Sequence, residues 1–304
     1  MLFNFREKLN SRKFLVTAEV SPPKGTRFSA SLEDARQLRG IADALNVTDN
    51  QCSIMHMSSL AFSKLLLDEG HEPIMQLTCR DRNRIGLQSD LLGAYALGIR
   101  NICLMTGDYP TCGDHPGSKP VYDLDSVQLI ELVRKLDSGI DLAGNKLDGG
   151  TSFCAGAVSG IDPEKTMQLI KLEKKVRCGA DFIQTQAVYD IGTFEEFMEA
   201  VNHLEVPVIA GLIPLKSLGM AEFMNKNISG IHVPEEIMLR MKDASSPLEE
   251  GLSIASETIR ELTKLSRGSI LCQSGLIKTL QDCFQWQGFS RMIKTENQQI
   301  NMKK

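Results

Sequence analysis

Three polar side chains stand within or directly after apolar runs, at places where they could take part in chemistry. Glu19 lies inside the apolar run 14–20, and burial there would raise the pKa of its carboxyl and make it a credible proton donor. Asp108 follows Gly107, where the backbone can approach a ligand closely. Gln186 has apolar neighbours, and a buried amide needs several hydrogen-bond partners. These residues predict a proton donor and two polar ligand contacts.

Each of these residues also has a purely structural interpretation. Glu19 could be a salt-bridged residue at the end of a strand, and Asp108 could serve a turn or cap a helix. Gln186 could belong to a buried hydrogen-bond network. The segment 48–50 (TDN) could likewise be an Asx-rich turn. Taken one at a time, these positions leave both interpretations open.

Short apolar runs recur about every 30 residues with amphipathic stretches between them, as in consecutive βαβ units. We predict strands at 14–20, 44–48, 73–79, 101–107, 153–158, 181–188 and 206–213, and helices at 32–45, 58–69, 85–98, 125–138, 163–179 and 193–204. The strands are apolar on both faces, which is typical of a parallel sheet covered by helices.

An open doubly wound sheet and a closed barrel both fit this alternation. The even repeat and the length favour a single-domain α/β fold, the (β/α)₈ TIM barrel, whose typical size is about 250 residues. The lack of a GxGxxG motif after the first strand argues against a dinucleotide-binding Rossmann fold. We assign the barrel to 1–293, with extra helices, among them 235–243 and 248–266, before a last strand at 269–272. The remaining segment, 294–304, is predicted to be a polar tail without regular structure.

In such a barrel, catalytic groups lie at the carboxyl ends of the strands. Polar residues mark several of these ends: Glu19, Thr48, Asp49, Gln76, Thr78, Asp108, Gln184 and Gln186. The long Gly- and Pro-rich segment 108–124 follows the fourth strand on the same side. We therefore expect these side chains to lie together at the carboxyl-terminal end of the barrel, which we call its mouth.

The composition excludes several classes of function. The 304 residues carry a net charge of −4, which opposes binding to nucleic acid or to an anionic membrane. No run approaches the roughly 18 apolar residues of a membrane span, and the first residues lack the core of a signal peptide, so we expect a cytoplasmic protein. The 8 cysteines include no CxxC pair, so we predict reduced thiols and no metal site.

The strand ends together resemble the methylenetetrahydrofolate reductase family of flavoprotein barrels, over roughly residues 12 to 220. The matching motifs are 18–23 (AEVSPP), 46–49 (NVTD), 76–79 (QLTC), 106–110 (TGDYP), 172–181 (LEKKVRCGAD), 184–186 (QTQ) and 211–214 (GLIP). Their order along the chain makes the resemblance more specific than any single motif.

The resemblance implies flavin-dependent reduction of 5,10-methylenetetrahydrofolate to 5-methyltetrahydrofolate. Glu19 would be the general acid, Asp108 would contact the pterin near the flavin, and Gln186 would orient the pterin. The flavin, FAD with FMN as the alternative, would be bound by Thr48, Gln76, Thr106, Gly107, Asp108, Ala157 and Lys175. Electrons would come from NADH or NADPH or from a partner subunit, and the chain would form a homo-oligomer or a complex with a second reductase subunit.

The chain departs from the family pattern at four positions. Gln76, Thr106 and Ala157 stand where many members have His, Arg and an aromatic residue, and Leu218 stands where an aromatic residue often contacts the nicotinamide. The sequence looks closer to the reductases of anaerobic one-carbon metabolism, which work beside a zinc-containing subunit. Two alternatives stay open: a flavin-free folate-binding or scaffold subunit, and a barrel enzyme acting on a phosphorylated metabolite.

Overall fold

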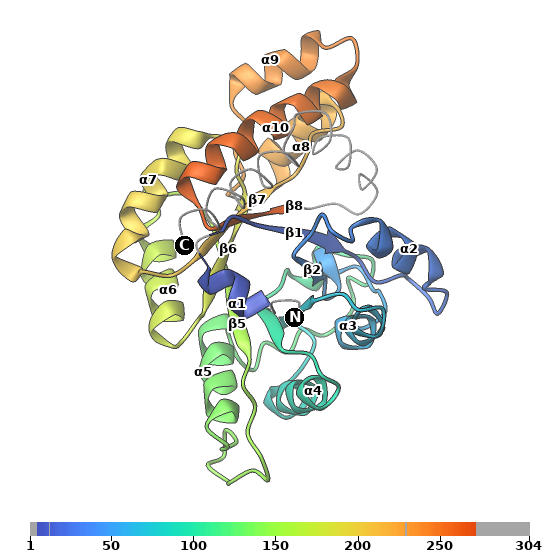
Figure 1. Cartoon of the computed structure of the whole chain (residues 1–304), viewed down its shortest axis with the longest axis vertical. Coiled ribbons are helices and arrows are strands. Elements are labelled where there is room, and N and C mark those ends of the chain that lie inside the picture. Colours follow the sequence, from blue (N-terminus) through green and yellow to red (C-terminus); the bar gives the residue numbers. More distant parts are fainter. Residues whose placement is uncertain (1–4, 12, 229, 272–304) are drawn as a thin grey trace, which may run out of the picture.

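Eight parallel strands form a closed barrel in the computed structural model, which describes residues 5–11, 13–228 and 230–271 (Figure 1). The strands are β1 (Leu15–Val20), β2 (Ala44–Val47), β3 (Pro73–Thr78), β4 (Asn101–Met105), β5 (Cys154–Ser159), β6 (Phe182–Ala187), β7 (Val208–Leu212) and β8 (Gly268–Leu271). They pair in chain order, and β1 pairs with β8 to close the barrel. The predicted TIM barrel is confirmed.

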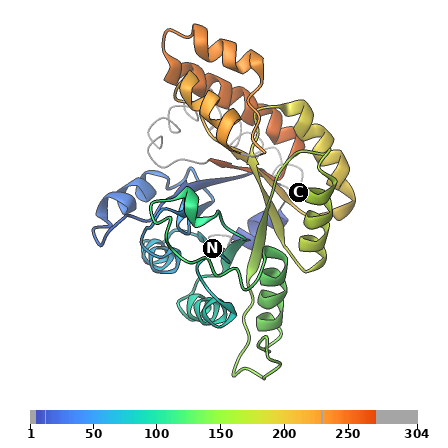
Figure 2. The same ribbon diagram turned by 180° about the vertical axis from the view of Figure 1, so that it is seen from behind.

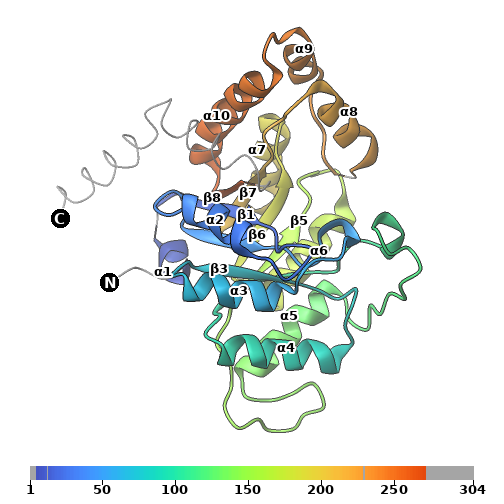
Figure 3. The same cartoon turned by 90° about the vertical axis from the view of Figure 1, so that its right-hand side faces the viewer.

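One helix, α1, precedes β1 and packs on the interior of the barrel, and the other helices follow the successive strands. The helices are α1 (Phe5–Asn10), α2 (Ser29–Gln37), α3 (Ser59–Asp68), α4 (Arg84–Ala96), α5 (Ser126–Asp137), α6 (Thr166–Arg177), α7 (Ile191–Val201), α8 (Leu218–Asn227), α9 (Glu235–Asp243) and α10 (Pro247–Leu265). Short 3₁₀ turns are η1 (Gln51–Ser53), η2 (Pro110–Cys112) and η3 (Asn202–Leu204). The predicted extra helices before the last strand are confirmed as α8, α9 and α10, which lie together on one side (Figures 1 and 3).

Most predicted strands and helices differ from the structure by one to three residues at an end, and one helix differs more. The helix predicted at 32–45 was wrong at its C-terminal end, because α2 stops at Gln37 and the chain then turns through Gly40 at φ 75° before β2. The periodicity did not predict α1, whose six residues are too few for a helical pattern. The predicted last strand begins one residue earlier than expected, at Gly268. Residues 272–304, including the predicted tail and the domain boundary at 293, lie outside the described residues.

One apolar side chain from each strand fills the amino-terminal half of the barrel interior. These are Leu15, Ala44, Ile74, Cys103, Cys154, Phe182, Ile209 and Ile270, and α1 covers them with Phe5 and Leu9. The rings of Phe5 and Phe182 meet edge to face, with centroids 5.3 Å apart. A Cβ at Gly156 would overlap the Phe182 ring, so only glycine leaves room for this packing.

The two-residue period of the strands places the next inward side chains above this apolar layer. Along β1, Leu15 is followed by Thr17 and then Glu19, so the interior becomes polar toward the carboxyl ends of the strands. Figure 3 shows α1 at one end of the barrel and the segment after β4, in green, at the other; Figure 2 looks onto that second end. No helix in the described part of the chain is long and apolar enough to cross a membrane.

Candidate active site

A buried hydrogen-bond chain crosses the barrel below its mouth. Gln184 Nε2 donates to Asn46 Oδ1 at 2.7 Å, and Asn46 Nδ2 donates to Thr17 Oγ1 at 3.2 Å. These three residues come from β6, β2 and β1 and are at most 3% exposed. Their mutual bonds satisfy amides that would otherwise be costly to bury. Gln184 is therefore a structural residue that supports the layer above it.

Glu19 lies directly above this layer, on β1, and is only 8% exposed. Its neighbour in the register is Asn46 on β2. Burial raises the pKa of its carboxyl from 4.5 to about 7, against a smaller lowering by a hydrogen bond with Gln51. A carboxyl with this pKa is close to half protonated at neutral pH, so it can both give and take a proton.

The segment after β2 contains one functional candidate and one structural carboxylate. Thr48 is 1% exposed at the carboxyl end of β2. Asp49 accepts hydrogen bonds from Thr78 N and Thr78 Oγ1, both at 2.9 Å, and its two oxygens bind Arg82 at 2.8 and 3.1 Å. Asp49 therefore connects the ends of β2 and β3. This long-range role differs from the local Asx turn that the sequence also allowed.

Asp108 projects from the mouth, where it is exposed. The preceding Gly107 has φ 91°, and a Cβ there would press on Thr78 and Arg80 at 3.1 to 3.3 Å. The Asp108 carbonyl accepts hydrogen bonds from Tyr122 Oη at 2.9 Å and from Ser53 Oγ at 3.0 Å. The carboxylate is thus accessible to water while the backbone that carries it is held on two sides.

The turn η1 contacts both acidic residues: Gln51 hydrogen-bonds the Glu19 carboxyl, and Ser53 Oγ donates to the Asp108 carbonyl. Desolvation raises the pKa of the Cys52 thiol in this turn, and the charges of Asp108 and Glu19 raise it by a smaller amount. The turn follows β2 and contacts η2 in the segment after β4. The structure therefore brings both predicted acidic residues around one turn.

A cavity of about 720 Å³ opens beside this turn, at the carboxyl end of β4. It is lined by Thr106, Gly107, Tyr109, Tyr122, Leu124, Asp125, Val127, Gln128 and Lys174. The rings of Tyr109 and Tyr122 lie 5.5 Å apart at its edge. Aromatic faces, exposed backbone and a lysine can receive a planar heteroaromatic group that bears an anionic chain.

Of the predicted flavin contacts, Thr106 and Gly107 line this cavity, whereas Thr48, Gln76, Asp108, Ala157 and Lys175 do not. Ala157 is fully buried among apolar side chains that include Leu104 and Ile183, in the layer between the strands and the helices. The strand alternation turns its neighbour Val158 toward the barrel interior instead, where it packs on the inner core.

Lys175 is also buried, on α6, and its Nζ donates to the Val158 carbonyl at 2.6 Å. Desolvation lowers the pKa of this amine to about 8. Its neighbour Lys174 is exposed and lines the cavity. On composition alone both lysines would be placed on a solvated surface, and nothing in a Lys-Lys pair distinguishes the two.

Gln76 and Gln186 lie on β3 and β6, on the carboxyl side of the apolar layer that contains Ile74 and Phe182. Gln76 is 9% exposed, and its carbonyl accepts a hydrogen bond from Ser59 Oγ at 2.8 Å. Gln186 is partly buried, and its side-chain oxygen lies so close to Gly230 that a Cβ there would overlap it. Gln186 is therefore held against the segment between α8 and α9, at the rim of the barrel.

Arg80 and Gln51 were not anticipated from the sequence. Arg80 is 2% exposed and connects the ends of three strands, and Gln51 contacts the Glu19 carboxyl. The charged segment 80–84 (RDRNR) resembles a solvated loop in composition. No local pattern distinguishes a buried arginine in such a loop from an exposed one.

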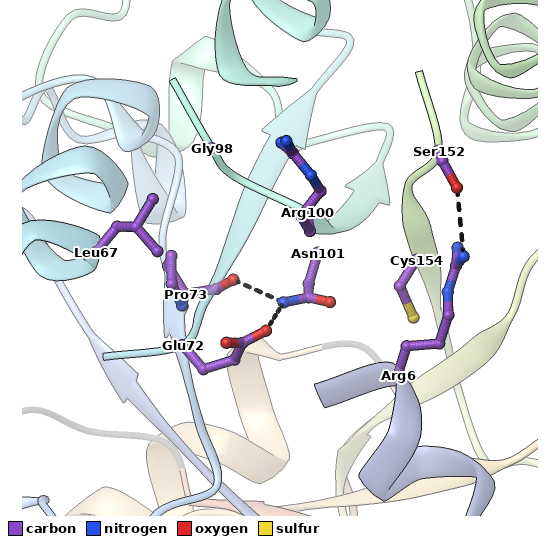
Figure 4. Close-up of a pocket in the computed structure, with 9 residues that line it drawn as sticks. All are labelled: Arg6, Leu67, Glu72, Pro73, Gly98, Arg100, Asn101, Ser152 and Cys154. Atoms are coloured by element: carbon purple, nitrogen blue, oxygen red, sulfur yellow. Dashed lines mark hydrogen bonds between the residues drawn. The ribbon is translucent and has the colours of Figure 1, made fainter. Parts of the chain in front are cut away.

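A second cavity, of about 220 Å³, lies at the opposite end of the barrel (Figure 4). Pro73, Asn101 and Cys154, which begin β3, β4 and β5, line it together with Arg6 of α1. Asn101 Nδ2 donates to Glu72 Oε1 at 2.7 Å, so the polar groups there are largely used within the protein. Residues at this end of a TIM barrel generally serve stability, so we place the active site at the other end.

Within the described ranges, no three His, Cys, Asp or Glu side chains are grouped so that they could hold a metal ion. The carboxyl end of the barrel holds a buried carboxyl, a second carboxylate, amides and a cavity with two tyrosines.

Comparison with protein families gives a match to the model described as "Methylenetetrahydrofolate reductase" over residues 4–273. "Methylenetetrahydrofolate reductase 2" of Schizosaccharomyces pombe is 29% identical over 275 residues, which cover 85% of this chain and 42% of that protein. The "5,10-methylenetetrahydrofolate reductase" of Salmonella typhimurium is 26% identical over 206 residues, covering 64% of this chain and 62% of that protein. The chain thus spans less than two thirds of the length of these relatives.

Solved structures give a similar fold at low sequence identity. A protein from Clostridium thermocellum, described as binding two copies of 5-methyl-5,6,7,8-tetrahydrofolic acid, has a TM-score of 0.63 at 17% identity, covering 89% of this chain and 92% of that one. A 2,3-dimethylmalate lyase has a TM-score of 0.51 at 12% identity, covering 96% of both chains. At these identities the similarity establishes the barrel fold.

Proposed function

Since this chain belongs to the methylenetetrahydrofolate reductase family, we propose that it catalyses flavin-dependent reduction of 5,10-methylenetetrahydrofolate to 5-methyltetrahydrofolate. The observation that carries the proposal is the buried Glu19 carboxyl, with a pKa of about 7, at the mouth of the barrel. A neutral carboxyl at neutral pH is the form that a general acid requires.

Glu19 would protonate N10 of the substrate as the bond between N10 and the methylene carbon breaks. Opening of the five-membered ring leaves a positively charged iminium at N5, and the methylene carbon then accepts a hydride and becomes the methyl group. The buried surroundings of Glu19 keep its proton available, and Gln51 holds its carboxyl in place. The expected contribution of a positioned acid is about 10²- to 10⁴-fold in rate.

Asp108 would stabilise the cationic iminium with its carboxylate, which is exposed at the mouth of the barrel. Gln186 would orient the pterin from the opposite wall of the barrel, through its amide on β6. These two roles follow the family resemblance, and the positions of the residues at one mouth support them.

The residues present fit a flavin in the cavity beside Asp108. Gly107 allows close backbone approach, and Tyr109 and Tyr122 offer aromatic faces. Thr106 would hydrogen-bond the ring system, Lys174 would bind the anionic chain, and Thr48 and Gln76 would contact the group from the barrel side. The bound flavin would supply the hydride. We favour FAD, with FMN as the alternative.

The donor of electrons to the flavin would be NADH or NADPH, or a second subunit of a reductase complex. Leu218 begins α8 and packs in the cluster of α8 and α9, so no aromatic side chain stands at that position for a nicotinamide. We propose a homo-oligomer or a complex with a second reductase subunit, acting in the cytoplasm.

The first experiment is an anaerobic absorption spectrum of the purified chain, followed by addition of methylenetetrahydrofolate to the dithionite-reduced protein. Reoxidation of the flavin is the expected result. Glu19→Gln should retain flavin and lose reoxidation rate by about 100-fold or more, whereas Glu196→Gln, an exposed change on α7, should behave as the unmodified chain. A colourless protein that takes up no flavin but binds folate would favour the flavin-free folate-binding subunit.

A further inference from the structure

Arg80 follows β3 and is the most connected charged side chain at the mouth of the barrel. Its side chain is 3% exposed. The guanidinium donates to Ser53 Oγ at 3.0 Å, to the Asn50 carbonyl at 3.1 Å and to the Asp108 carbonyl at 3.4 Å. Asp81 balances its charge through two bonds of 2.9 Å. One planar group thus joins the segments that follow β2, β3 and β4.

Ser53 extends this connection toward Asp108. Its Oγ accepts from Arg80, and its single hydroxyl proton is shared between the carbonyls of Asp108 and Tyr109, each at 3.0 Å. The Asp108 carbonyl therefore receives bonds from Arg80 and Ser53, in addition to the one from Tyr122. Two of the three groups that hold this carbonyl are thus Arg80 itself and a side chain that Arg80 binds.

Arg80 also binds the turn around η1, which contains the Gln51 side chain that contacts Glu19. Asn50, Cys52 and Ser53 have φ of 48°, 52° and 58°, in the left-handed region that side chains rarely adopt. Such backbone conformations are unfavourable for residues with side chains and persist where surrounding contacts determine them. Gln51 lies inside this turn and hydrogen-bonds the Glu19 carboxyl. Release of the turn would withdraw that contact.

We propose that Arg80 is a positioning residue that couples the general acid Glu19 to Asp108, through the Gln51–Ser53 turn on one side and the Asp108 backbone on the other. This inference rests on the proposed function for the roles of the two carboxyl groups. Arginine suits the task because its planar fork presents several donors in fixed directions, whereas lysine would reach only part of these acceptors.

The test compares Arg80→Met and Arg80→Lys with Arg134→Met. Arg134 is a matched control because it donates to the carbonyls of Phe153 and Gly179 at the amino-terminal end of the barrel, far from the mouth. For Arg80→Met we expect that flavin is retained and that kcat is lower by about 10- to 100-fold. The pH at which kcat falls should be higher than in the wild type, because Gln51 no longer lowers the pKa of Glu19. Arg80→Lys should recover part of the rate.

Arg134→Met should lose thermal stability and keep the wild-type pH profile. The proposal is overturned if Arg80→Met, with flavin bound, has the same kcat and pH profile as the Arg134 variant. If Arg80→Met does not fold, Ser53→Ala removes the bridging hydroxyl alone and should move the same pH profile in the same direction by a smaller amount. An unchanged profile in Ser53→Ala would then overturn it.

A readout independent of activity separates this inference from the proposed function. Cys52 is exposed within the strained turn, so its rate of alkylation by iodoacetamide, measured by peptide mass spectrometry against Cys178, reports the turn. The rate at Cys52 should rise about threefold or more in Ser53→Ala, which keeps the Arg80 charge that lowers the pKa of the Cys52 thiol, and it should stay constant in Arg134→Met. If the unmodified chain fails to reduce methylenetetrahydrofolate, the proposed function is wrong, but this result does not refute the coupling through Arg80. An unchanged alkylation rate at Cys52 would refute the coupling.

Discussion

Replacement of Glu19 by glutamine is expected to stabilise the fold at alkaline pH while it lowers turnover by about 100-fold or more. In the native state, burial raises the pKa of this carboxyl from 4.5 to about 7. At about 1.4 kcal/mol per pH unit, this change corresponds to about 3 kcal/mol that the ionised side chain costs the fold. Because the glutamine side chain carries no charge, the variant avoids that cost.

The sign follows from proton binding. Between pH 4.5 and about 7 the native state holds a proton on Glu19 that the unfolded chain has released, so the stability of the wild type falls as pH rises through this window. Below pH 4.5 both states are protonated and the cost is absent. The free energy of unfolding of Glu19→Gln, relative to wild type, should therefore increase by about 3 kcal/mol from about pH 4.5 to about pH 8.

Urea unfolding at about pH 4.5, 6, 7 and 8 measures this difference directly, with turnover assayed on the same samples. Glu196→Gln provides the control, since an exposed substitution should change stability by about 0.5 kcal/mol or less at every pH. A difference between Glu19→Gln and wild type that does not vary with pH would refute the claim that Glu19 is buried and protonated near neutrality.

Three further predictions concern the barrel that supports the site. Gly156→Ala should lower the free energy of unfolding by about 1–3 kcal/mol because its Cβ meets the Phe182 ring, and Phe182→Leu should restore part of it; an unchanged urea midpoint would contradict the packing. Gln184→Leu should cost about 1–3 kcal/mol by leaving Asn46 without its donor, and a double-mutant cycle with Asn46→Leu should show coupling; simple additivity would exclude the buried bond. Burial lowers the pKa of Lys175 from 10.5 to about 8, so between these values the unfolded chain binds a proton that the native state has released. The free energy of unfolding of the wild type, relative to Lys175→Met, should therefore rise by about 3 kcal/mol from about pH 7 to 10.5. A difference that does not vary with pH would show that the amine is solvated.

Much of the fold followed from local pattern. Apolar runs every 30 residues or so predicted the strands, and Gly70, Gly98 and Gly179, each with positive φ, follow helices as expected of helix-terminating glycines. These features depend on near neighbours along the chain, because the side-chain period and the turn residues are local properties. The exception was α1, whose two apolar residues become informative only once a barrel interior exists for them to close.

The positions of the candidate residues were predicted with uneven success. Glu19 and Asp108 stand at strand ends as expected, and the turn η1 contacts both, through Gln51 and Ser53. Ala157 and Lys175 were assigned by motif, but their side chains point into packed regions, while Val158 and Lys174 take the accessible directions. A shift of one residue reverses the face of a strand, so a motif alone could not decide between neighbours.

The sequence by itself determined the parallel α/β architecture, the order of strands and the strand ends at which polar chemistry would gather. Only the tertiary structure decided which of those groups meet: that Asp49 is tied to Arg82, that Arg80 joins three strand ends, and that Gln184 bonds across the barrel to Asn46. The reason is physical. The periodicity of the sequence indicates which face of an element is buried. The burial of Glu19, and with it the pKa and the partners of its carboxyl, depends on strands far apart in the chain. Closure of the barrel brings these strands together.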